Sequence, residues 1–125
     1  MSDPQTKVAG IPKTIKVGPV IFTVRVDKDA WLSIEHETMT KGYYGHTRPQ
    51  TGEIFLNPEH ASDVHRLTLW HEVIHALLET VAGSPDWAPM PDDKKEREEM
   101  VVRELEAPTL TVLRDNPELV AYLVA

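Results

Sequence analysis

The sequence contains no cysteine, which excludes disulfide bonds and metal sites built on thiolates. Any metal ion must therefore be held by His, Asp, Glu and water. No apolar run approaches the roughly 18 residues that span a membrane, and the first ten residues hold no hydrophobic stretch typical of a secretory signal. These absences fit a cytosolic protein.

Clusters of positive charge are also lacking, and the net charge is -7. The densest basic group, Lys94, Lys95 and Arg97, is surrounded by acidic residues. Binding to nucleic acid needs clustered Lys and Arg to neutralise phosphates, so we expect no nucleic-acid partner. A length of 125 residues predicts one domain with one hydrophobic core. Residues 1–12 are polar, with two prolines and a glycine, and are predicted to form a flexible tail.

Two segments have the composition of β-hairpins. Residues 14–27 are rich in β-branched side chains on both sides of Gly18 and Pro19. Residues 43–46 and 53–56 are strand-like and flank a turn that contains Pro and Gly, and Asn57 and Pro58 end this hairpin. Residues 29–39 fit either a short helix or an irregular connection.

Helices are predicted in the second half of the chain. A long one runs from about residue 62 to residue 82, with Ser62 or Asp63 as its N-cap. After a proline-rich loop, a second spans residues 93–107 and is ended or kinked by Pro108. A short helix restarts after Asn116, with Pro117 at its first position. The predicted fold class is α+β: a small antiparallel or mixed sheet of hairpins packed on the long helix, which is buried, and on a second, C-terminal helix.

The long helix carries the motif "LTLWHEVIHALLE". His71 and His75 are one turn apart, about 40° around the helix axis, so both rings project from one face. The helix is apolar nearly all round, which predicts that it is buried. A buried neutral histidine needs a partner for its ring nitrogens, so two on one face favour a metal ion over ordinary core packing.

Glu72 lies at the margin of this face, where it can reach a water molecule bound to the metal. This is the H-E-x-x-H pattern of zinc peptidases, in which two histidines bind Zn2+ and the glutamate takes the proton of the water. The zinc lowers the pKa of that water towards about 7. The sequence thus predicts a metal site at His71 and His75, with Glu72 as general base.

A catalytic zinc usually has three protein ligands. No histidine follows His75, and the metzincin continuation is absent because Leu78 and Val81 occupy its glycine and histidine positions. The third ligand is therefore a carboxylate downstream or a residue upstream.

On the second predicted helix, Val102 and Leu105 define the side expected to face the core. The carboxylates that flank this side within roughly 60° are Glu98, Glu99 and Glu106. At this point all three remain candidates for the third ligand.

The hairpins, then "TLWHEVIHALLE", then "EEMVVRELEAPTLTVLRDNPEL", resemble small metallopeptidase-like proteins of phages and prophages, related in pattern to the ImmA/IrrE-like zincins. The resemblance covers most of the chain from about residue 14. It implies that residues 13–125 form a single minimal zincin-like domain in the cytoplasm of a bacterial host. It also implies a gluzincin-type third ligand, which is a glutamate on the following helix. By position this ligand is Glu99, and Glu98 and Glu106 are the second and third choices.

Zincins hold the substrate backbone on a strand beside the active-site helix, and the resemblance implies the same use of 43–46 or 53–56 here. Tyr43, Tyr44 and His46 are then candidates to stabilise an oxyanion, although ordinary strand packing is the favoured explanation of these residues. His65, about 120° from His71, is expected to be exposed.

The preferred function is hydrolysis of a peptide or protein substrate by a zinc-dependent peptidase. The first alternative is a zinc-stabilised regulatory or binding protein of phage origin with little proteolytic activity. The second is an α+β protein without a metal.

Overall fold

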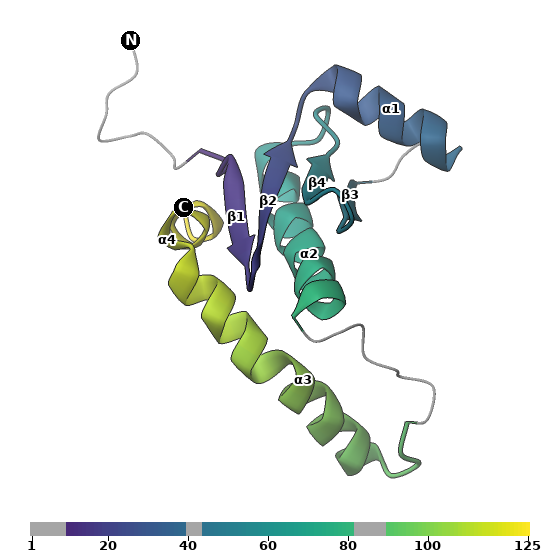
Figure 1. Ribbon diagram of the computed structural model, residues 1–125, viewed down its shortest axis with the longest axis vertical. Helices are drawn as coiled ribbons and strands as arrows, with labels where there is room; N and C mark the ends of the chain where they lie inside the picture. The colour runs from purple at the N-terminus through teal and green to yellow at the C-terminus, as the bar shows by residue number, and fades with distance from the viewer. Residues whose placement is uncertain (1–9, 40–43, 82–89) are drawn as a thin grey trace.

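The computed structural model describes residues 10–39, 44–81 and 90–125, and it has the expected α+β class. One four-stranded sheet has the order β1-β2-β4-β3. Its strands are β1 (Thr14–Val17), β2 (Val20–Arg25), β3 (Gly45–Arg48) and β4 (Glu53–Leu56). The helices are α1 (Lys28–Thr38), α2 (Ser62–Thr80), α3 (Lys94–Asp115) and α4 (Pro117–Leu123) (Figure 1).

Both predicted hairpins are confirmed. β1 pairs antiparallel with β2, and Gly18 takes the left-handed φ of 58° that the tight turn between them requires. β3 pairs antiparallel with β4 through a turn in which Gly52 has a φ of 66°. The first strand of this hairpin begins at Gly45 rather than at Tyr43, and Tyr43 lies outside the described residues.

The two hairpins join through a parallel pairing of β2 with β4, which makes the sheet mixed. A parallel pair needs a crossover connection, and this one contains α1. The segment that was predicted to be either a short helix or an irregular connection is thus a helix, over residues 28–38. Asp27 caps α1 by accepting a hydrogen bond from the backbone N–H of Ala30.

Helices lie on both faces of the sheet (Figure 1). Successive residues of β4 alternate between the faces, so Ile54 and Leu56 join the main core with α2, while Phe55 packs with Trp31 and Ile34 of α1. The main core also contains Leu69, Val73, Ala76 and Leu77 of α2 and Ile15, Val17 and Phe22 of the first hairpin. α2 thus has one strongly buried face against the sheet.

The prediction that α2 is buried all round is wrong. Leu67 is 73% exposed, and His71 and His75 are exposed as well. The sheet and the C-terminal helices cover only part of its circumference. The N-cap is Ala61, one residue before the predicted caps, and it makes no side-chain capping hydrogen bond.

α3 extends further than predicted, because it continues through Pro108 to Asp115. Val102, expected to face the core, is 48% exposed, whereas Leu105 does pack against the main core. The N-terminal half of α3 extends away from the sheet (Figure 1). Only the C-terminal half contributes a fully buried side chain, that of Val112.

Asn116, between α3 and α4, holds the outer edge of the sheet. Its side-chain oxygen accepts from the backbone N–H of Lys16 in β1, and its amide nitrogen donates to the carbonyl oxygens of Lys16 and Val112, each at 2.7–2.8 Å. The amide thereby takes the place of a neighbouring strand at the free edge of β1, which otherwise would present unpaired backbone groups. The predicted restart of the helix at Pro117 is confirmed.

We expect Asn116→Ala to lower the free energy of unfolding by about 2–3 kcal/mol, because three hydrogen bonds are lost and the Lys16 backbone groups lose their partners. Chemical denaturation of the variant measures this loss. Glu118→Ala, an exposed change in the first turn of α4, is the control and should stay within about 0.5 kcal/mol of the wild type. Equal stability of the two variants would contradict the role of Asn116.

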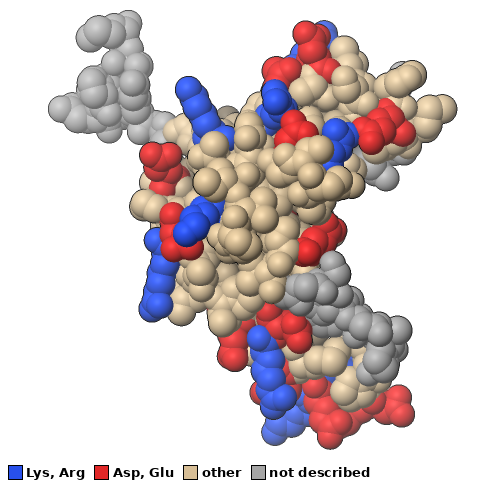
Figure 2. All heavy atoms as spheres, in the orientation of Figure 1, with Lys and Arg blue, Asp and Glu red and all other residues tan. Residues whose placement is uncertain are grey.

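Two observations concern the surface of the described residues. No helix among them is long and apolar enough to cross a membrane. On the face drawn in Figure 2, Lys and Arg side chains are interspersed with Asp and Glu, and the centre of the face is mostly uncharged.

Candidate metal and active site

A groove of about 510 Å³ lies between α2 and β3, which is one of the two edge strands of the sheet. α2 lines one wall with a row of residues four apart, Leu67, His71, His75 and Glu79, together with Thr68 and Glu72. The other wall consists of residues 44–47. The three predicted residues of the H-E-x-x-H motif therefore line a single groove.

The two histidines lie side by side at the centre of this row. The centroids of the His71 and His75 rings are 4.8 Å apart, and the rings meet edge to face. The His71 side chain is 64% exposed. The prediction that burial makes these two histidines costly without a metal is therefore wrong. A metal site is favoured instead by their shared position in an open groove.

Glu72 differs from its neighbours because it is only 5% exposed. Its Oε1 accepts a hydrogen bond of 2.6 Å from the hydroxyl of Thr47 in β3. Its Oε2 lies 3.9 Å from His71 Nε2, on the side of the histidines. A carboxylate held beside two accessible imidazoles could act as a base next to a metal ion that the imidazoles bind.

The alternation of β3 decides which of its side chains face the groove. Gly45 and Thr47 pair with Leu56 and Ile54, so they lie on the α2 side of the sheet. His46 pairs with Phe55 and lies on the other face, where the two ring centroids are 6.4 Å apart. The side chain of His46, a candidate for oxyanion stabilisation, thus packs towards α1.

Tyr44, the second such candidate among the described residues, lines the groove and is 59% exposed. Its ring packs against His60 at 4.5 Å between centroids. His65, expected to be exposed, is only 8% exposed, and its Nε2 lies 2.6 Å from the carbonyl oxygen of Asn57. His65 therefore connects the start of α2 to the residue that follows β4, and it does not line the groove.

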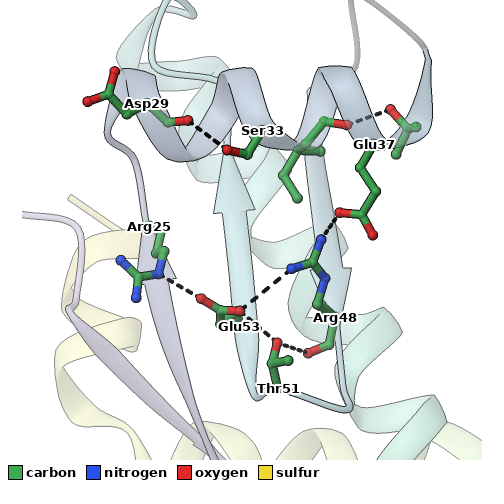
Figure 3. Close-up of polar contacts among 9 residues, drawn as sticks. Arg25, Asp29, Ser33, Glu37, Arg48, Thr51 and Glu53 are labelled. Atoms are coloured by element: carbon green, nitrogen blue, oxygen red, sulfur yellow. Dashed lines mark hydrogen bonds and ion pairs between the residues drawn. The ribbon is translucent and has the colours of Figure 1, made fainter.

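An ion-pair network on the α1 side holds β3 in place (Figure 3). Arg48 of β3 pairs with Glu37 of α1 and with Glu53 of β4, and Glu53 also bonds Arg25 of β2. The hydroxyl of Thr51 donates to Glu53, and together with Arg25 and Arg48 it lowers the pKa of the Glu53 carboxyl despite partial burial. The edge strand that lines the groove is thus tied to both neighbouring elements.

The structure does not bring Glu99 to the histidines. Glu99 is exposed on α3 and lines a separate hollow with Lys95, Glu96 and Arg103. Glu98 and Glu106 are also exposed on α3. Among the described residues, no three His, Asp or Glu side chains are close enough together to bind one metal ion. The assignment of Glu99 as third ligand stays a prediction.

Sequence reasoning missed two residues of the groove. Glu79 follows His75 by four positions, so helical spacing alone places it in the same row. Thr47 could be found only from the pairing of β3, because its role depends on which face of the strand it occupies.

Comparison of the chain with protein-family models, curated proteins and solved structures finds no match. The assignment of a metal therefore depends on the donors themselves. His71 and His75 fit two of the ligands of a catalytic zinc, and Glu72 fits the base beside them. The described residues place no third protein ligand with this pair.

Proposed function

We propose that the protein is a zinc-dependent peptidase that hydrolyses peptide bonds in the groove between α2 and β3. The observation that supports this best is the different environment of the three motif residues. His71 and His75 are exposed to the groove, whereas Glu72 is buried beside them with one oxygen hydrogen-bonded and the other near His71. Two metal ligands must be accessible, and a general base must be held in place.

In the proposed reaction, His71 and His75 would each hold the zinc through one ring nitrogen, and the proposed third ligand is Glu99, which the described residues do not place beside them. A zinc ion held there would act as a Lewis acid on the substrate carbonyl and would lower the pKa of a bound water molecule. Glu72 accepts a proton from the attacking water at Oε2 and then delivers it to the nitrogen of the leaving amine. The water oxygen bonds to the carbonyl carbon first, and the C–N bond breaks afterwards, when the leaving nitrogen takes up the proton from Glu72.

The edge strand β3 is the feature that favours a peptide over other classes of substrate. Among the described residues β3 pairs only with β4, so none of them pairs with its outer backbone edge beside the motif. An extended peptide adds to such an edge by main-chain hydrogen bonds. At one end of the groove, Leu67 and Tyr44 offer exposed apolar surface, which favours substrates with an apolar side chain there.

Metal content and cleavage, measured together, test this function. The protein is dialysed against a low concentration of zinc and then against zinc-free buffer, and its zinc is determined by mass spectrometry. We expect about one zinc per chain and cleavage of a quenched-fluorescence peptide library that stops when the zinc is removed. Absence of retained zinc would overturn the metal site, and a zinc-loaded protein that cleaves no peptide would overturn the peptidase.

The same zinc measurement identifies the third ligand. We expect Glu99→Gln to weaken zinc binding by about 10³-fold, since one of three ligands contributes on the order of a third of the 10–16 kcal/mol typical of structural zinc. Glu98→Gln and Glu106→Gln are matched controls on the same helix. If Glu79→Gln weakened zinc binding and Glu99→Gln did not, the ligand would come from α2 and the assignment of Glu99 would be wrong.

A further inference from the structure

The carboxylate of Glu72 has two oxygens in different environments. Oε1 accepts the 2.6 Å hydrogen bond from Thr47 Oγ1. Oε2 lies 3.9 Å from His71 Nε2 and has no hydrogen bond from any described residue. One oxygen is thus held by the strand, and the other lies near His71.

The proton of the Thr47 hydroxyl has two acceptors within reach, both on Glu72. The backbone carbonyl oxygen is 3.1 Å from Oγ1, and the carboxylate oxygen is 2.6 Å from it. A hydroxyl donates one proton, and the contact with the side-chain oxygen is the shorter of the two. The proton therefore lies on the bond to Oε1, and the longer contact places Thr47 against the same turn of α2.

Gly45, two residues earlier on the same face of β3, confines the stem of Glu72. A Cβ atom at this position would lie 3.0 Å from Glu72 Cγ and 2.8 Å from Thr68 Cγ2. The strand can approach α2 this closely only because residue 45 has no side chain. Gly45 thus lies close to the Cγ atom of Glu72, and Thr47 holds the end of that side chain.

We propose that Thr47 is a positioning residue that holds Oε1 of Glu72 and thereby directs Oε2 towards the reacting water. This inference rests on the proposed peptidase function. It assigns Thr47 no contact with substrate or metal. β3 consequently has two roles, because its outer edge binds the substrate backbone while its inward side chains orient the base.

The test compares Thr47→Val, which keeps the shape and removes the hydroxyl, with Thr47→Ser, which keeps the hydroxyl. The substrate is the peptide that the wild type cleaves fastest in the quenched-fluorescence library. We expect Thr47→Val to lower kcat by about 10- to 100-fold, the usual effect of losing a supporting hydrogen bond, with KM changed less than about 2-fold. Thr47→Ser should retain most of kcat.

Thr23→Val, the same change at an exposed position of β2, is the matched control and should leave kcat unaltered. Equal zinc content and melting temperature exclude loss of metal or folding as the cause. If Thr47→Val does not fold, Thr47→Ala replaces it. Unchanged kcat in the folded variant, or failure of Thr47→Ser to restore it, would overturn the proposal.

A second readout needs neither zinc nor substrate, so it separates this inference from the proposed function. In metal-free protein labelled with [13Cδ]glutamate, the Glu72 resonance is identified by its loss in Glu72→Gln. We expect Thr47→Val to shift this resonance and Thr47→Ser to leave it near its wild-type position, because the carboxyl carbon senses the hydrogen bond. A resonance that is identical in all three proteins would overturn the contact, whether or not the protein is a peptidase.

Discussion

Glu72→Gln is expected to retain zinc at the wild-type level and to lower kcat for peptide cleavage by about 10²- to 10⁴-fold, the usual contribution of a general base. Glutamine has nearly the same shape, and its amide oxygen still accepts from the Thr47 hydroxyl. Although Glu72 is only 5% exposed, the substitution opens no cavity because the two side chains have nearly the same shape. The loss is therefore one of proton transfer and not of folding.

Metal analysis and single-turnover cleavage of the two proteins measure this effect side by side. Glu118→Gln, at an exposed position on α4, is the matched control for the chemical change. Cleavage by Glu72→Gln at the wild-type rate would contradict the proposed mechanism. A cellular effect that survives in the variant would instead support the alternative of a zinc-stabilised regulatory or binding protein.

Short-range patterns predicted much of this molecule. The spacing of His71 and His75 places both rings on one face whatever the helix packs against. The hairpin turns could also be predicted from neighbouring residues, because Gly18 and Gly52 supply the positive φ angles that these turns need. In each case the residues within one turn of a helix or hairpin determine the structure.

Predictions that needed partners distant in sequence were less accurate. The apolar residues all round α2 predicted a buried helix, but burial depends on how many elements surround it, and the groove side is left open at Leu67. Likewise, Pro108 removes one backbone donor from α3, yet the helix continues to Asp115 because its C-terminal half packs on the core through Val112.

The candidate site depends on the register of β3. A strand over residues 43–46 beside the motif helix makes Tyr43, Tyr44 and His46 the candidates for stabilising an oxyanion. Because side chains alternate, the observed pairing places Thr47 towards Glu72 and the His46 side chain towards α1. Register follows from pairing with β4, and neither local propensity nor spacing in the sequence contains that information.

The second large effect is expected on zinc binding when a histidine of the groove is replaced. We expect His75→Ala to weaken zinc binding by about 10³-fold or more, by the same reasoning that applies to one of three ligands. The metal-free variant should nevertheless be as stable as the wild type within about 0.5 kcal/mol, because an exposed side chain makes few contacts and alanine favours the helix. His71→Ala should behave in the same way.

Thermal unfolding with and without zinc separates these two effects. A ligand present at 100 times its dissociation constant stabilises the folded state by about 2.7 kcal/mol, so zinc should raise the melting temperature of the wild type and leave that of His75→Ala unchanged. His36→Ala, at an exposed position of α1, is the matched control and should keep the full zinc response. If the metal-free His75→Ala protein were itself strongly destabilised, the histidine would be a core residue. If it kept the zinc response of the wild type, His75 would not be a ligand.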